Sequence, residues 1–69
     1  MRISSYDRDA PVPEVRSRWV WEAGRPGARQ GVTVTDVMWN GEEWWVQSQG
    51  SSGRYWNDLG RFWEAVSPA

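Results

Sequence analysis

The sequence predicts a small all-β domain, and three observations support this fold class. Val15–Glu22 and Gly31–Trp39 alternate apolar with polar side chains at the period of two that is typical of a half-buried strand. Asn40-Gly41, the strongest short-range hairpin signal, follows the second of these segments. Residues 42–49 then supply a returning strand, and Gly50-Ser51-Ser52-Gly53 supplies a second turn. We therefore expect an antiparallel meander of three strands.

The second strand changes phase along its length. Its first apolar residues, Val32 and Val34, have the opposite parity to Val37 and Trp39. One extra residue in a strand returns the later side chains to the same face of the sheet. The pattern therefore predicts a β-bulge at Asp36.

Residues 54–66 allow two interpretations. Four apolar residues have the spacing of one helix face: Trp56, Leu59, Trp63 and Val66. The alternative is a short strand at Tyr55-Trp56, a helical turn at residues 57–61 and a last strand at Phe62–Val66. Gly60 would cost an α-helix about 1 kcal/mol, which favours the second interpretation. We expect an all-β fold of five strands with a short helical turn near the C-terminus; the alternative is an α+β fold, a three-stranded meander plus a C-terminal helix.

Residues 1–14 are expected to form a flexible N-terminal arm ahead of a domain at residues 15–69. The arm is mostly polar, and Pro11 and Pro13 remove backbone donors from it. Gly and Pro in residues 23–28 predict a loop. No apolar run approaches the roughly 20 residues that span a bilayer, and the N-terminus lacks the apolar core of a signal peptide. We expect a cytoplasmic protein, from a bacterium or a phage, with no membrane partner.

The composition argues against an enzyme. The chain of 69 residues contains neither Cys nor His, so it has no thiol nucleophile, no imidazole base and neither of these metal ligands. It also contains no Gly-rich loop ending in Lys and Ser or Thr, which would hold a phosphate. We therefore assign no catalytic residue, no metal and no cofactor.

Residues 31–66 resemble the Src-homology-3 barrel. The resemblance lies in the order strand, turn, adjacent tryptophans, Gly turn, strand, helical turn and last strand, read in Gly31-Val32-Thr33-Val34, Asn40-Gly41-Glu42-Glu43-Trp44-Trp45-Val46, Gly53-Arg54-Tyr55-Trp56-Asn57-Asp58-Leu59 and Phe62–Val66. It implies that residues 15–69 form a small five-stranded SH3-like barrel. Three features of the family differ here or have no clear match. They are its Pro-Ser-Asn-Tyr turn, its small core residue at the position of Gln47 and its aromatic N-terminal motif. Tudor-like and chromo-like barrels share the same shape.

The resemblance also implies a ligand groove. Trp44 would line it with Trp39, Tyr55 and Trp56, and Glu43 and Asp58, with Glu42, would form an acidic edge. An aromatic and acidic surface attracts a cation, such as an Arg or Lys side chain of a peptide. The arm residues Pro11-Val12-Pro13 offer a second hypothesis, in which they lie across this groove.

The seven tryptophans point to a binding role. Neighbours on a strand face opposite ways, so Trp44 and Trp45 cannot both enter one core, and we expect at least two exposed indoles. Exposed tryptophan is enriched at binding surfaces. We therefore favour a protein or peptide recognition module. The alternatives are a single-stranded nucleic-acid binder that uses Arg and aromatic stacking, a carbohydrate binder, and a homodimer seam.

Overall fold

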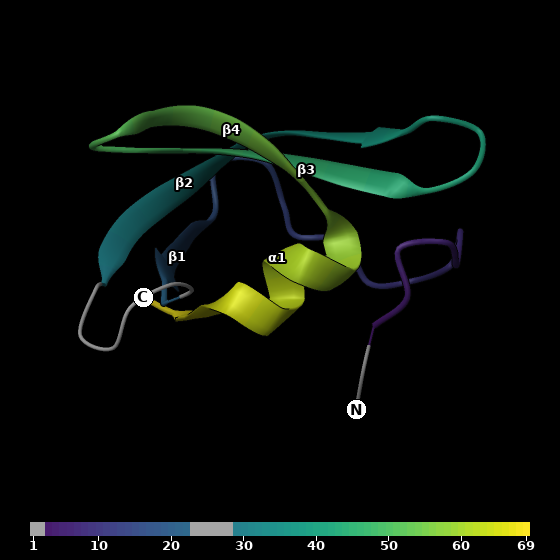
Figure 1. The fold of residues 1–69 in the computed structure, drawn as a ribbon, viewed down its shortest axis with the longest axis horizontal. Helices are drawn as coiled ribbons and strands as arrows, with labels where there is room; N and C mark the ends of the chain where they lie inside the picture. The colour runs from purple at the N-terminus through teal and green to yellow at the C-terminus, as the bar shows by residue number, and fades with distance from the viewer. Residues whose placement is uncertain (1–2, 23–28) are drawn as a thin grey trace.

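A computed structural model describes residues 3–22 and 29–69, so the loop expected at residues 23–28 lies outside the described residues. Neighbouring strands of its sheet are antiparallel, in the order β4-β3-β2-β1-β5. Figure 1 shows α1 beneath the curved sheet. In chain order, the described elements are β1 (Arg18–Trp21), β2 (Gln30–Trp39), β3 (Trp44–Gly50), β4 (Gly53–Asp58), α1 (Leu59–Ala65) and β5 (Val66–Pro68).

The sheet stays open, because β4 and β5 are its two edges and do not pair with each other. The prediction of a mainly β fold is confirmed, whereas the strand pairings do not support the closed barrel that the resemblance implies. α1 joins β4 to β5 and contacts both of them as well as β3. The helix therefore occupies the position at which a direct turn would have brought the two edge strands together.

β2 contains a bulge, one residue before the predicted position. The β2–β3 register shifts by one residue between Val34 and Asp36, which leaves Thr35 as the extra residue, whereas Asp36 pairs with Gln47. Thr35 Oγ1 donates to the side-chain oxygen of Gln47 at 2.9 Å, so the partner strand holds the extra residue in place. Val37 then packs against the core, as the change of phase predicted.

The β2–β3 turn differs from the predicted Asn-Gly hairpin. Residues 40–43 separate the two strands, and Gly41 has a positive φ of +97° whereas Asn40 does not. Asn40 Oδ1 accepts the backbone N–H groups of Glu42 and Glu43, at 2.9 and 2.8 Å. A side-chain acceptor that closes the turn locally therefore replaces the second left-handed residue that a type I′ turn needs.

β1 is shorter than the predicted strand Val15–Glu22. It begins at Arg18, because Arg16 has a φ of +78° and turns the chain before the strand starts. The Arg16 N–H donates to the Val34 carbonyl oxygen at 2.7 Å, and the Val34 N–H donates to the Ser17 carbonyl oxygen at 2.9 Å. The segment before β1 is therefore bonded to β2 without being a regular strand.

The C-terminal segment contains both a helix and a strand. The α-helix at residues 59–65 is longer than the helical turn predicted at residues 57–61. The last strand lies at residues 66–68, so its predicted position at Phe62–Val66 is wrong. The helical spacing of the apolar residues decides the structure here, because Leu59, Phe62 and Ala65 of α1 are all buried.

Asp58 connects β4, α1 and the N-terminal segment. Its Oδ2 accepts the backbone N–H of Arg61 at 3.1 Å, an N-cap bond that typically stabilises a helix by about 1 kcal/mol. The Ser5 hydroxyl donates to the same oxygen at 2.6 Å and accepts the Gly60 N–H at 2.8 Å. This cap offsets the unfavourable helix propensity of Gly60 and places Ser5 over the first turn of α1.

The core lies between the sheet, α1 and residues 3–13. Trp19 contacts the rings of Phe62 and Trp63 edge-on, at centroid distances of 6.0 and 5.2 Å. Ser5, Ala10 and Pro13 are buried, although the composition of residues 1–14 offered little reason to expect this. The largest fully buried side chains are Phe62, Leu59, Val34 and Val46.

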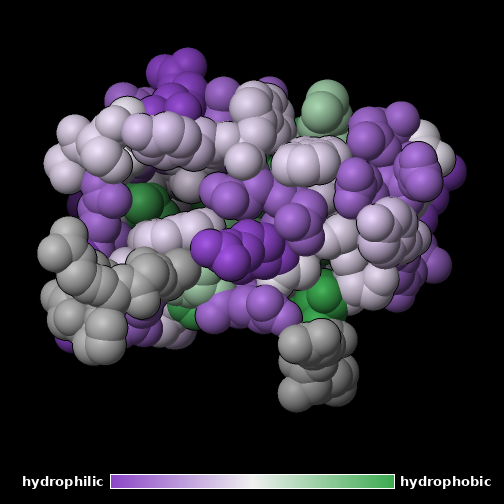
Figure 2. Space-filling view, in the orientation of Figure 1, coloured by the Kyte–Doolittle hydropathy of each residue, from purple (hydrophilic) through white to green (hydrophobic). Residues whose placement is uncertain are grey.

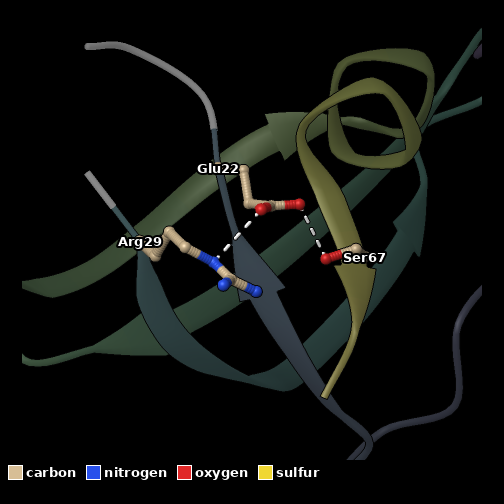
Figure 3. A network of polar contacts seen from close by, with 3 residues as sticks. All are labelled: Glu22, Arg29 and Ser67. Atoms are coloured by element: carbon tan, nitrogen blue, oxygen red, sulfur yellow. Dashed lines mark hydrogen bonds and ion pairs between the residues drawn. The ribbon is translucent and has the colours of Figure 1, made fainter. Parts of the chain in front are cut away.

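Polar contacts join β5 to β1 (Figure 3). Glu22 Oε1 lies 3.1 Å from Arg29 Nε, and the Ser67 hydroxyl donates to Glu22 Oε2 at 2.7 Å. The Glu22 N–H also donates to the Ala65 carbonyl oxygen at 2.7 Å. Because the ion pair is largely exposed, it contributes only about 0–1 kcal/mol. The Ser67 hydrogen bond is the polar side-chain contact that ties the short strand β5 to Glu22.

Gly60→Ala should destabilise the protein although alanine is the better helix former. A Cβ at this position would lie 2.9 Å from the Ile3 carbonyl oxygen and 3.1 Å from Ser5 Oγ. We expect a loss of about 1–2 kcal/mol in the free energy of unfolding, measured by urea titration. The control is Gly31→Ala, whose Cβ would meet nothing within 4 Å. A gain for Gly60→Ala would contradict the packing of the N-terminal segment on α1.

Arg16→Gly should stabilise the protein by about 0.5–1 kcal/mol. The left-handed backbone of Arg16 strains a residue that carries a Cβ, and glycine adopts it without strain. Arg18→Gly, inside β1, should instead lower the free energy of unfolding by about 0.5–1 kcal/mol. The same sign of change in both variants would argue against a left-handed turn at Arg16.

Candidate functional site

A groove of about 300 Å³ lies on one face of the sheet. Residues from β1, β2, β3 and β4 line it, so it lies on the concave side of the sheet between β4 and β1. In the view of Figure 2, a hollow below β4 shows hydrophobic atoms at its floor. Grooves of this size accommodate one or two side chains or a small ligand.

The pairing of β3 with β4 places the groove residues. Ser48 lies opposite Tyr55, and Val46 lies opposite Asn57, so these four side chains share one face of the sheet. Val46 is fully buried, which identifies this face as the concave one. Tyr55 and Asn57 therefore face the groove, above a floor that includes Val32.

Two aromatic side chains form the walls of the groove. Tyr55 is 57% exposed, and its hydroxyl donates to the Ser52 carbonyl oxygen at 2.9 Å, which fixes the ring against the β3–β4 turn. Trp21, on β1, lines the opposite side and packs partly against the core. Apolar parts of a ligand can therefore contact a ring on each side.

Gln30 closes the end of the groove near the β3–β4 turn. Its carboxamide lies 2.9 Å from Ser51 Oγ and 3.2 Å from Ser52 Oγ. In the orientation that satisfies both amide atoms, its oxygen also accepts the backbone N–H groups of these two serines. Gln30 is thus committed to the protein and shapes the groove without offering free hydrogen-bonding atoms of its own.

Asn57 and Ser48 supply free polar groups inside the groove. Neither side chain has a hydrogen-bond partner among the described residues. The polar atoms of both remain accessible to solvent. The Asn57 carboxamide therefore presents one acceptor and two donors to a ligand, and the Ser48 hydroxyl presents one donor and its lone pairs. These groups lie between the two aromatic walls.

The described lining of the groove is uncharged. None of the described residues that line it is Asp, Glu, Arg or Lys. These residues therefore offer a ligand apolar surface and hydrogen bonds. The described lining residues are Trp21, Gln30, Val32, Ser48, Gly50, Ser52, Gly53, Tyr55, Trp56 and Asn57.

The six residues predicted from the resemblance do not gather around one groove. Trp39 and Trp44 are cross-strand partners with ring centroids 5.5 Å apart, at the turn that contains Glu43. Tyr55 and Trp56 line the groove, and their partners on β3, Ser48 and Gln47, are four and three residues away from Trp44. The sixth residue, the acidic Asp58, caps α1 and binds Ser5. The aromatic and acidic side chains are therefore distributed over three places.

Trp44 is covered by the chain's own N-terminal segment. Its indole N–H donates to the Arg8 carbonyl oxygen at 3.1 Å, and its backbone N–H donates to the Ser5 carbonyl oxygen at 2.7 Å. Trp63, on α1, donates to the Pro11 carbonyl oxygen at 2.9 Å. The segment around Pro11 thus does lie across aromatic side chains, and these are Trp44 and Trp63 rather than Tyr55 and Trp56.

The tryptophans lie mainly at the margin of the core. Trp56 is 42% exposed, and the other six are partly buried. We expected at least two exposed indoles, and the structure has one, that of Trp56. Indole rings at the margin keep their N–H groups within reach of polar partners, as Trp19 does with Ser17 Oγ at 2.8 Å.

Sequence reasoning missed Trp21, Ser48 and Asn57 as groove residues. Ser48 carried the clearest signal, because a polar residue two positions after Val46 falls on the buried face of the strand. Asn57 shares the parity of Tyr55 within β4. The open seam between the edge strands could not be foreseen from the pattern, because the resemblance implied a closed barrel.

Other kinds of site find little support. Within residues 3–22 and 29–69, no three Asp or Glu side chains gather as they would to hold a metal ion. None of the helical segments in this part of the chain is long and apolar enough to cross a membrane.

Comparisons with protein-family models, curated proteins and solved structures gave no match. Function is therefore inferred from the geometry of the groove.

Proposed function

We propose that this chain is a non-catalytic recognition module that binds an uncharged peptide segment of a partner protein in the groove beneath β4. The observation that carries this proposal is the pair of unpartnered polar side chains, Asn57 and Ser48, set between the aromatic walls of Tyr55 and Trp21. An apolar groove with a few convergent polar groups is the usual form of a ligand site.

A peptide fits the chemistry of these groups. The Asn57 carboxamide has the donor and acceptor pattern of a peptide unit, so it can bond to both the N–H and the C=O of an extended segment. Tyr55 and Trp21 can then enclose an apolar or aromatic side chain of that segment. The uncharged lining residues favour a segment without charge, in place of the Arg or Lys side chain suggested by the acidic residues.

Carbohydrate binding is the second candidate, because aromatic walls with amide and hydroxyl groups also suit an uncharged sugar. Single-stranded nucleic acid gains less support, since binding of phosphates needs basic side chains and none of the described lining residues is Arg. Catalysis is disfavoured in the same way, because none of the described lining residues is an acid or a base that works near neutral pH.

The test is selection of short random peptides displayed on phage, with the intact chain as bait. We expect enriched peptides to lack charge and to carry an aromatic or apolar residue. Asn57→Ala should weaken a selected peptide about tenfold, because it removes hydrogen bonds made in a partly desolvated site. Asn57→Asp, which keeps the shape and adds a charge, should weaken it at least as much. Calorimetry and Trp21 fluorescence measure the binding.

Two further variants complete this experiment. Tyr55→Phe keeps the ring and should weaken binding by only a few-fold, whereas Tyr55→Ala should weaken it more than tenfold. Gln49→Ala lies on the opposite face of β3 and should leave the affinity unchanged. Equal binding of the selected peptides by all of these variants would refute the site. Stronger quenching by uncharged oligosaccharides than by any peptide would favour the carbohydrate alternative.

A further inference from the structure

β4 is an unprotected edge strand. It is six residues long, and residues 51–56 are all exposed. Proteins usually protect such edges with Pro, Lys, a bulge or a covering segment. β4 contains neither Pro nor Lys, and its register with β3 has no irregularity. The other edge of the sheet, β5, is three residues long and includes Pro68.

The register determines which backbone groups of β4 are free. Gly50 pairs with Gly53 across the two-residue loop Ser51–Ser52, and a turn of this kind is closed by a hydrogen bond between its first and fourth residues. Bonded and non-bonded pairs then alternate along the ladder, so Tyr55 and Asn57 bond to β3. The N–H and C=O groups of Arg54 and Trp56, and the N–H of Asp58, are left directed away from the sheet.

The two charges of β4 lie two residues on either side of Trp56. Arg54, Trp56 and Asp58 pair with Gln49, Gln47 and Trp45 of β3, and Arg54 Nη2 donates to Gln49 Oε1 at 3.3 Å. If a second β4 lies antiparallel to the first with Trp56 opposite Trp56, Arg54 of each copy lies opposite Asp58 of the other. Asp58 uses Oδ2 for the helix cap, and its second oxygen has no hydrogen bond within the described part of the chain.

We infer that β4 is a homodimerisation strand, which pairs with β4 of a second copy about a two-fold axis at Trp56. In this register the free backbone groups of the two strands face each other. The two Trp56 residues exchange two hydrogen bonds, and each Asp58 N–H donates to the Arg54 carbonyl oxygen of the other copy. The Asp58 carbonyl takes no part, because the carbonyl of an N-cap residue accepts the first bond of its helix.

The dimer would join the two grooves. Residues of odd number face the groove, so Tyr55 of one copy would lie opposite Asn57 of the other on the concave side. Trp56 also lines the groove, so different residues test the two proposals, Asn57 for the groove and Arg54 for the dimer.

The test is sedimentation velocity of the intact chain from about 10 µM to about 1 mM, because one strand from each copy makes a small and therefore weak interface. We expect the mass to rise from 8.0 kDa toward twice that value. Trp56→Pro should hold the chain at 8.0 kDa, since it removes an N–H that does not bond to β3. Trp56→Thr, which keeps this N–H, should weaken the dimer less.

Charge variants test the register. Arg54→Glu should weaken the dimer at least about tenfold, because it places like charges opposite each other twice. Arg54→Glu combined with Asp58→Asn, which preserves a helix cap, should recover part of this loss. Arg18→Glu makes the same change in net charge on β1 and should leave the dimer intact. Circular dichroism verifies that each variant is folded.

A chain that remains at 8.0 kDa up to about 1 mM would overturn the proposal, as would a dimer that persists in both Trp56→Pro and Arg54→Glu. Equal weakening by Arg54→Glu and Arg18→Glu would also overturn it, because the effect would then come from net charge alone.

Discussion

Asp58 is the last residue of β4 and the N-cap of α1, and its carboxylate binds the Arg61 N–H and the Ser5 hydroxyl at once. These bonds turn the chain from the sheet into a helix beneath it. Because α1 follows β4 directly, β5 reaches the sheet only beside β1, at the opposite edge. The cap therefore stabilises the helix that separates the two edge strands along the chain.

The open seam has two consequences on one strand. Residues of odd number in β4 face inward, where Tyr55 and Asn57 line the groove. Residues of even number face outward, where Arg54 and Trp56 flank a free backbone edge. The period of two along a strand thus separates a ligand surface from an assembly surface within six residues. Arg54 and Asn57 each belong to one surface, whereas Trp56 borders both.

Local patterns predicted the part of the fold that depends on local interactions. Alternation placed β2 to within one residue, and the change of parity after Val34 placed the bulge to within one residue as well. Other features did not follow from the alternation pattern. The Asn40 side chain closes its own turn, the left-handed Arg16 shortens β1, and Ser5 binds an oxygen 53 residues away. The groove was also missed, because its lining brings together residues of β1, β2, β3 and β4 that lie far apart in sequence.

The seven tryptophans are explained better by stability than by binding. Few side chains are fully buried here, the largest being Phe62, Leu59, Val34 and Val46, so the domain must gain apolar contact at the margin of its core. An indole suits this margin, because its ring packs inward while its N–H reaches a polar group. Trp19, Trp44 and Trp63 each do so, with a hydroxyl or a carbonyl of the chain itself as the partner.

Abundance of tryptophan is therefore explained largely by stability, and it does not by itself identify a binding surface. What distinguishes the groove is the combination of aromatic walls with polar groups that the chain leaves without partners. Among the described residues, Asn57 and Ser48 lack the hydrogen bonds that the marginal indoles have found. Two solvent-accessible polar groups in one hollow lined by aromatic rings are the usual form of a ligand site, and marginal indoles alone are not.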